Sequence, residues 1–263
     1  MTSRMLSASR RCRGVLFDLD DTLVPTSAID KRAIHVAATR ALGAAGSAAA
    51  AAAAARFADL LKTEPFPPAD SEFDVSHWRS LLWTRALNVE ATESTAVAPE
   101  AKAAFDTWST ERLDKFVLED AVVAMVHRLQ ELGYKTGVLT NGHKDVQRAK
   151  TRACEAGALF GDAHVIIAGE HPEQKPHASV FRVACAALGE EPSAVVMVGD
   201  SYAADITGGI NAGLLATVWV HPPDDDGSSL MYGHLAAVPA GQPAPTHTVG
   251  SVLELEAVLE QIG

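Results

Sequence analysis

Several features are scarce in this 263-residue sequence, and each scarcity excludes a class of protein. Its three cysteines, Cys12, Cys154 and Cys185, stand at unrelated spacings, which is typical neither of a disulfide framework nor of a zinc site. No uncharged apolar run approaches the roughly 18 residues of a membrane span, and the alanine run 48–55 is too short and too weakly hydrophobic. We therefore expect a cytoplasmic protein in a reducing compartment.

Basic residues are also scarce, with 22 Lys and Arg against 33 Asp and Glu, a net charge of -11. Nucleic acids and anionic membranes need a positive surface, so neither is expected as a partner, whereas a small anionic substrate stays possible at a local site. The first 13 residues are an exception, because they contain Arg4, Arg10, Arg11 and Arg13 and no acid. A frayed terminus and a short organelle-targeting segment both fit this stretch.

The chain is organised around an apolar run at 15–17 that ends abruptly in the carboxylates of Asp18, Asp20 and Asp21. The run predicts a buried strand of a parallel sheet, and in such sheets ligands bind beyond the carboxyl ends of the strands. Asp18 and Asp20 point to the same side if the chain stays extended. Two acids on one side favour a divalent metal, or a phosphorylated substrate with its metal, between them.

The pattern of the remaining chain divides it in two. Residues 25–116 show only helical periodicity, with helices expected at 29–42, 48–61, about 78–86 and 99–113. From residue 117 on, helices, among them 144–156 and 204–212, alternate with short apolar strands. The strands are expected at 135–139, 165–168, 194–198, 216–220 and 246–249. Such alternation indicates βαβ units. We therefore predict an α/β protein with a Rossmann-like parallel sheet core, formed by residues 1–24 and 117–263, and an inserted all-helical domain at 25–116.

Polar residues of different chemical character follow the other strands. Thr140 and Asn141 follow the second strand, Lys175 precedes a helix, and Asp200 follows the fourth strand with Asp205 one turn on. Each residue alone has a structural explanation: Asn141 and Asp200 as helix caps, Lys175 as an exposed charge, and the acidic triplet as a solvated turn. Capping alone does not readily explain the whole set in this order and spacing.

The set suits phosphoryl transfer from a monoester. One carboxylate attacks phosphorus and forms an acyl phosphate, and a second gives a proton to the leaving oxygen and later takes one from water. A divalent ion, a lysine, a hydroxyl and backbone N–H groups balance the charge on the phosphoryl oxygens. Because the uncatalysed reaction is so slow that enzymes accelerate it by up to ~10²¹-fold, several rigid groups must act together.

From about residue 13 to the end, these four motifs resemble those of the haloacid-dehalogenase-like hydrolase superfamily. The resemblance implies that Asp18 is the nucleophile and Asp20 the general acid/base. Within the superfamily this second acid separates phosphatases from the dehalogenases. It further implies phosphoryl binding by Thr140 and Asn141, and a Lys175 that steadies both the nucleophile and the phosphate.

The resemblance also implies a metal cofactor and identifies the inserted helical domain. Mg²⁺ would be held by Asp18, the backbone carbonyl of Asp20 and Asp200, with Asp205 supporting that shell. The helical domain at 25–116 matches the cap that members carry after the first strand. Since the cap usually selects the substrate, the motifs leave the substrate open.

We therefore expect a Mg²⁺-dependent phosphatase acting on a small phosphorylated metabolite, such as a sugar acid phosphate. A nucleotidase or a phosphoglycolate-type phosphatase is the alternative within the same superfamily. A catalytically silent binding protein on this fold is the alternative outside enzymes. A monomer and a homodimer are both compatible with the sequence.

Two further features have competing interpretations. His143 follows the second motif and could reach a phosphate there, although a lone histidine in a loop is more often solvated. Trp78, Trp83 and Trp108 are expected in the core of the helical insert rather than as a platform for substrate.

Overall fold

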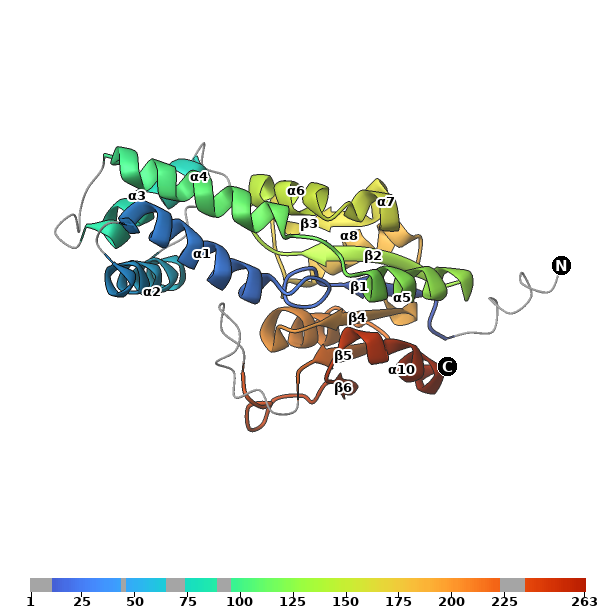
Figure 1. The fold of residues 1–263 in the computed structure, drawn as a ribbon. Helices are drawn as coiled ribbons and strands as arrows, with labels where there is room; N and C mark the ends of the chain where they lie inside the picture. Colours follow the sequence, from blue (N-terminus) through green and yellow to red (C-terminus); the bar gives the residue numbers. More distant parts are fainter. Residues whose placement is uncertain (1–10, 44–45, 65–73, 89–95, 223–234) are drawn as a thin grey trace. The chain divides into compact units, whose positions relative to one another are not determined.

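A computed structural model describes residues 11–43, 46–64, 74–88, 96–222 and 235–263. The basic stretch up to residue 10 and most of the Pro-, Gly- and Asp-rich loop after residue 222 lie outside these ranges. The chain divides into two compact units (Figure 1). We call Met1–Pro25 with Val117–Gly263 the core unit, and Thr26–Phe116 the helical unit.

The described part of the core unit contains one sheet of six parallel strands in the order β3-β2-β1-β4-β5-β6. The strands are β1 (Gly14–Phe17), β2 (Lys135–Thr140), β3 (Val165–Ile167), β4 (Val195–Gly199), β5 (Ala216–Val220) and β6 (His247–Val249). Every residue of β1, β4 and β5 is buried, as expected for strands covered on both faces. The α/β fold class predicted from the sequence is confirmed, and β1 lies in the middle of the sheet.

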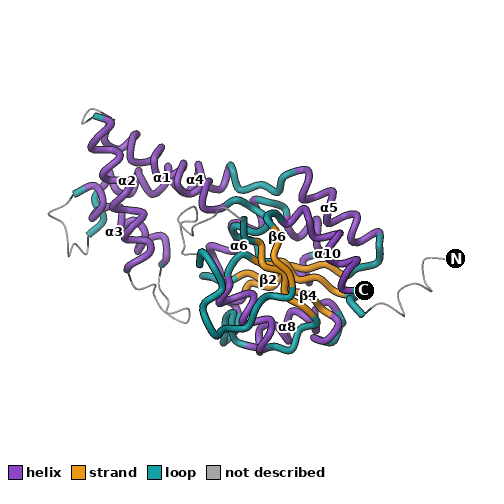
Figure 2. Tube along the Cα trace, turned by 90° about the horizontal axis from the view of Figure 1, so that it is seen from below, coloured by secondary structure: helices purple, strands orange, loops and turns teal. Residues whose placement is uncertain are grey.

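Helices cover both faces of this sheet: α5 and α10 lie on one face and α8 on the opposite one (Figure 2). The helices of the core unit are α5 (Asp120–Glu131), α6 (Lys144–Ala153), α7 (Ala156–Phe160), α8 (Ala178–Leu188), α9 (Gly208–Asn211) and α10 (Leu255–Ile262). The face under α8 is an apolar cluster in which Val180, Phe181 and Ala184 pack against Leu16 and Met197. This packing fixes the strand ends that carry the polar motifs.

Two helix predictions in the core unit need correction. The helix expected over 144–156 stops at Ala153, because Glu155 adopts a left-handed backbone conformation (φ 52°) before α7 begins. The helix expected over 204–212 begins earlier, as a π-helix at Tyr202–Thr207 that α9 continues. The wide turn includes a bond from Ile206 N to Ser201 O, and it places Asp205 beneath the end of β4.

The helical unit contains four helices in its described part, as the periodicity predicted. They are α1 (Thr26–Leu42), α2 (Ser47–Thr63), α3 (Val75–Leu87) and α4 (Pro99–Asp114). Phe57 of the alanine-rich α2 stacks on Trp83 with ring centroids 3.9 Å apart, and meets Trp108 edge-on at 5.2 Å. Because Trp83 and Trp108 are almost completely buried, their expected place in the core is confirmed, while Trp78 is half-buried.

None of the helices in the described ranges is long and apolar enough to cross a bilayer.

Candidate active site

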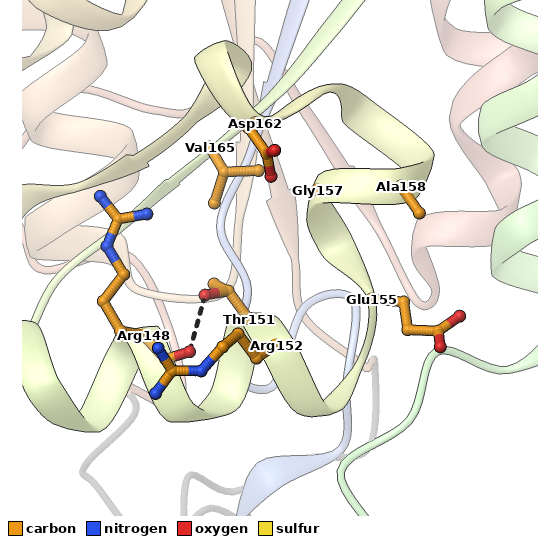
Figure 3. A pocket seen from close by; sticks show the side chains of 8 residues that line it. All are labelled: Arg148, Thr151, Arg152, Glu155, Gly157, Ala158, Asp162 and Val165. Carbon is orange, nitrogen blue, oxygen red and sulfur yellow. Dashed lines mark hydrogen bonds between the residues drawn. The ribbon is translucent and has the colours of Figure 1, made fainter.

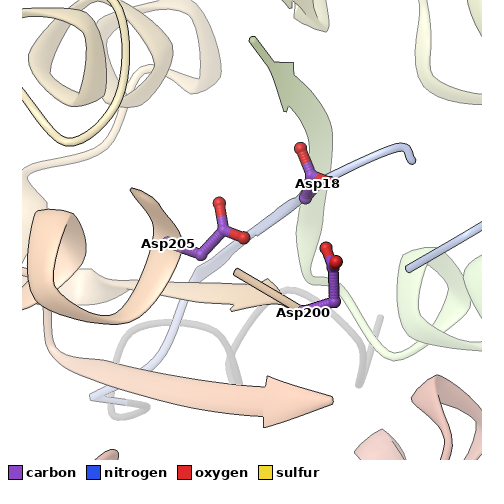
Figure 4. Close-up of side chains that lie close together, drawn as sticks. All are labelled: Asp18, Asp200 and Asp205. Atoms are coloured by element: carbon purple, nitrogen blue, oxygen red, sulfur yellow. The ribbon is translucent and has the colours of Figure 1, made fainter. Parts of the chain in front are cut away.

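Three carboxylates predicted as site residues come together at the carboxyl edge of the sheet (Figure 4). Asp18 follows β1, Asp200 follows β4, and Asp205 lies in the π-helix after β4. Their carboxylate oxygens lie within 4.8 Å of one another, and all three residues are buried. The backbone N–H of Asp18 donates to the carbonyl of Val198, so the sheet ladder continues to the residue that carries the first carboxylate.

Lys175 lies at the centre of this cluster. Its Nζ donates to Asp18 Oδ1 at 2.6 Å, to Asp205 Oδ1 at 2.7 Å and to the carbonyl of Leu139 at 2.7 Å. These bonds use the three hydrogens of the ammonium group. The side chain is 1% exposed, so the alternative of an exposed surface charge is wrong. Burial alone lowers the pKa of Lys175, but the carboxylates of Asp18 and Asp205 outweigh it, and the net effect raises this pKa.

The charges of the cluster do not balance. Burial raises the pKa of the Asp18 carboxyl well above its ordinary value, Lys175 opposes this, and the acids Asp205, Asp200 and Asp20 raise it further. Burial likewise raises the pKa of Asp205. If all three carboxylates were ionised, the one ammonium would leave two negative charges without a partner in a buried site. Since the donors are all oxygens, the set fits a hard divalent cation such as Mg²⁺.

Asp205 is held from both sides by the protein. One carboxylate oxygen accepts from Lys175, and the other accepts from the backbone N–H of Ser201 at 3.0 Å. A Cβ at Gly199 would collide with this carboxylate, so the position before Asp200 requires glycine. These contacts fix the Asp205 carboxylate, and its supporting role at a metal stays a prediction.

Asp200 has two partners that the sequence did not reveal. Thr22 Oγ1 donates to Asp200 Oδ1 at 3.0 Å. Trp219 Nε1 donates to the backbone carbonyl of Asp200 at 2.7 Å. Trp219 lies opposite Gly199 in the ladder of β4 and β5, and a buried indole N–H needs a partner, which was the available signal.

The residues after β2 lock two loops together. The side-chain amide of Asn141 donates to the carbonyl of Lys175 at 2.8 Å and accepts from its N–H at 2.9 Å. The N–H of Gly142 donates to the side chain of Gln174 at 2.8 Å. The Asn141 side chain therefore sets the position of Lys175, and its role in phosphoryl binding stays a prediction. Thr140 is buried at the end of the same strand.

Asp20 lies in different surroundings from Asp18. Its side chain is 26% exposed, and it accepts from Lys150 Nζ at 2.6 Å and from Gln147 Nε2 at 2.9 Å. Neither Lys150 nor Gln147 was identified from the sequence. Both lie on one face of α6, three residues apart, directly after the Thr140 motif, and this spacing was the signal available.

Two neighbouring residues take structural roles. His143 is buried, and its ring caps α6 by accepting from the N–H of Asp145 at 3.3 Å, so the solvated histidine expected in this loop is wrong. Asp21 adopts a left-handed backbone conformation (φ 56°) and donates its N–H to Val24 O at 2.8 Å, closing the turn after β1.

A separate pocket of about 460 Å³ lies along α6 and α7 (Figure 3). Its lining consists of Arg148, Thr151, Arg152, Glu155, Gly157, Ala158, Asp162 and Val165. Charges of both signs surround it, and Arg148 is already paired with Glu170. None of the residues predicted for catalysis lines this pocket.

A family model described as haloacid dehalogenase-like hydrolase matches residues 12–213. The chain belongs to this family. Human N-acylneuraminate-9-phosphatase is 33% identical over 257 residues, which covers 96% of this chain and 95% of that protein. Phosphoserine phosphatase of Thermus thermophilus is 32% identical, over 85% of this chain and 96% of that protein. The family expected from the motifs is therefore confirmed.

Solved structures agree on the fold. A magnesium-bound hydrolase of this family from Bacillus subtilis, YfnB, matches with a TM-score of 0.62 and 20% identity, covering 95% of this chain and all of that one. A 2-haloacid dehalogenase from Pseudomonas syringae matches with a TM-score of 0.62 and 21% identity, over 96% of this chain. At this identity the neighbours support the architecture alone.

Proposed function

We propose that this protein is a Mg²⁺-dependent phosphatase that hydrolyses a small phosphorylated metabolite through an aspartyl-phosphate on Asp18. The observation that carries the proposal is the pairing of two differently placed acids at one strand end. Asp18 is buried against Lys175, while Asp20, two residues later, keeps a quarter of its side chain exposed. One is placed to act as a nucleophile, and the other can exchange protons with a substrate and with water.

The steps follow from this placement. Asp18 attacks phosphorus, and the bond to the leaving oxygen breaks as Asp20 delivers a proton to that oxygen. Asp20 then takes a proton from the water that attacks the aspartyl-phosphate, which releases phosphate and restores Asp18. Lys175 fixes the orientation of Asp18, and Thr140 with Asn141 would bind the phosphoryl oxygens.

Mg²⁺ held by Asp18, the carbonyl of Asp20 and Asp200 would supply the positive charge that lets two anions approach each other. The excess of buried carboxylates over ammonium groups in the cluster supports this ion. Thr22 and Trp219 hold Asp200 from its side chain and from its backbone, so this ligand is already oriented.

For the substrate, we propose a sugar acid phosphate, with N-acylneuraminate 9-phosphate the first to test. The support is the similarity to N-acylneuraminate-9-phosphatase over nearly the whole length of both chains. Phosphoserine and pyrimidine nucleotides are the next candidates, since relatives named for them also match, the nucleotidase over 48% of this chain. The intact set of acids and lysine argues against a silent binding protein.

The deciding experiment is a phosphomonoester panel assayed with Mg²⁺ and with EDTA, using the wild type and Asp18→Asn. We expect metal-dependent release of phosphate by the wild type, and a fall in kcat of at least ~10⁴-fold in the variant, as for loss of other nucleophiles. Asp21→Asn is the matched control, because asparagine tolerates the left-handed backbone at that position and the side chain has no catalytic task. Wild-type rates in Asp18→Asn would refute the proposal.

A further inference from the structure

We infer that Lys150 and Gln147 are positioning residues that hold the Asp20 carboxylate for proton transfer, and that Gln147 links it to Thr140. This inference rests on the proposed function, because it assigns Asp20 the proton-transfer role. It concerns two residues of α6 to which the phosphatase motifs give no task.

Both oxygens of the Asp20 carboxylate accept a hydrogen bond from α6. Lys150 Nζ lies 2.6 Å from Oδ1, and Gln147 Nε2 lies 2.9 Å from Oδ2. Two donors on opposite oxygens define the plane of the carboxylate, which a single hydrogen bond does not. The contact is therefore suited to aiming the group.

The Lys150 side chain is more deeply buried than the Asp20 carboxylate that it binds. The Lys150 side chain is 6% exposed, whereas that of Asp20 is 26% exposed. Burying an ammonium costs free energy unless it is paired, so this lysine has a fixed partner and little freedom to leave it. About a quarter of the Asp20 side chain remains accessible, which leaves room for contact with a substrate.

Gln147 connects Asp20 to the second motif. The two hydrogens of its amide serve two acceptors, Asp20 Oδ2 at 2.9 Å and Thr140 Oγ1 at 2.5 Å. The Thr140 hydroxyl, which accepts this bond, directs its own hydrogen at the carbonyl of Asn141 over a long 3.5 Å. A phosphoryl oxygen that came closer could take that hydrogen instead. The amide thereby fixes the spacing between the proton-transfer group and a predicted phosphate ligand.

The helix makes this arrangement rigid. α6 begins directly after the loop that follows β2, and the buried ring of His143 caps its first turn. Residues three apart on a helix project from the same face, so Gln147 and Lys150 reach Asp20 together. Groups on a capped helix hold their geometry better than groups on a loop.

The test compares leaving groups. p-Nitrophenolate departs without a proton, whereas an alkoxide needs one, so loss of a positioned acid should affect alkyl esters selectively. In Lys150→Met, we expect kcat/KM for glycerol 1-phosphate or N-acylneuraminate 9-phosphate to fall about 10–100-fold. We expect kcat/KM for p-nitrophenyl phosphate to stay within about threefold of wild type, because formation of the aspartyl-phosphate is spared.

The second chemical step has its own readout. Asp20 must also activate water, so p-nitrophenyl phosphate should show a burst of nitrophenol followed by slow turnover in Lys150→Met. Lys150→Arg keeps a donor and the charge, so we expect it to recover part of the kcat/KM that Lys150→Met loses on the alkyl esters. Arg152→Met is the matched control, because it removes a cation from an exposed position on the same helix. It should leave kcat/KM unchanged for the alkyl esters and for p-nitrophenyl phosphate.

Gln147→Met provides an independent test should Lys150→Met fold poorly. It removes the donor to Thr140 as well, so both esters should lose kcat/KM, with the larger loss on the alkyl ester. Equal losses on both esters in Lys150→Met and in Gln147→Met, or no loss in either, would overturn the inference. A wild type that hydrolyses neither ester with Mg²⁺ would instead count against the proposed function.

Discussion

Removal of the Lys175 ammonium tests the electrostatic account of the site. Lys175→Met keeps an unbranched side chain that is one atom shorter, and it deletes three hydrogen bonds of 2.6–2.7 Å, two of them to buried carboxylates. Removing one partner of a buried ion pair costs about 3–5 kcal/mol, because the other charge stays buried without compensation. For a protein of this size such a loss lowers Tm by about 6–20 °C.

The stability lost in Lys175→Met should increase as the pH rises. Burial already raises the pKa values of Asp18 and Asp205, and loss of the ammonium raises them further. A carboxyl with a raised folded-state pKa contributes most stability below its unfolded pKa, and loses that contribution as pH rises through the folded value. The variant should therefore be closest to wild type in acid and fall furthest behind near neutral pH.

Urea unfolding followed by circular dichroism, in EDTA and from about pH 5 to about pH 8, measures this difference. Lys135→Met is the matched control in the same unit. Its ion pair with Glu190 at 2.8 Å involves a lysine side chain that is 47% exposed, so it should cost at most about 1 kcal/mol. A Lys175→Met variant that matched this control, or that showed the same deficit at every pH, would refute the reasoning.

Two further predictions concern other buried groups. Burial raises the pKa of Cys154 and of Cys185 to about 11, so neither thiol should react with a thiol reagent near pH 8 until the protein is unfolded; rapid labelling of the native protein would contradict this. In the helical unit, Arg112 and Asp30 form a buried ion pair at 2.8 Å. Arg112→Met should therefore destabilise that unit by about 3–5 kcal/mol in a urea titration. An unchanged midpoint would show the pair to be dispensable.

The strand ends were predictable because they follow from a simple rule. Short apolar runs at 15–17 and 195–198, bounded by glycines, favour buried strands, and parallel strands bring their carboxyl ends to one edge of a sheet. Asp18 and Asp200 were therefore expected at the same edge of the sheet, and the pairing of β1 with β4 is what brings them together. Their distance apart in the sequence was irrelevant to that prediction.

The supporting residues were not predictable in the same way. The contact of Trp219 with Asp200 depends on the register of β5 against β4, and that of Lys150 with Asp20 depends on how α6 is rotated on the sheet. The position of Asp205 depends on a π-turn that helical periodicity does not reveal. Residue types and spacing define the groups that can react, while packing defines the groups that aim them.

The two acids of the first motif illustrate how packing separates chemical roles. Asp18 and Asp20 have the same side chain and lie two residues apart on one strand end. Asp18 is enclosed with two other carboxylates and shares Lys175 with one of them, so its charge is set by the buried cluster. Asp20 is held by a helix residue of its own, Lys150, and remains partly open. In the proposed mechanism, distinct environments, and not distinct residue types, would allow one acid to bind phosphorus while its neighbour moves the proton.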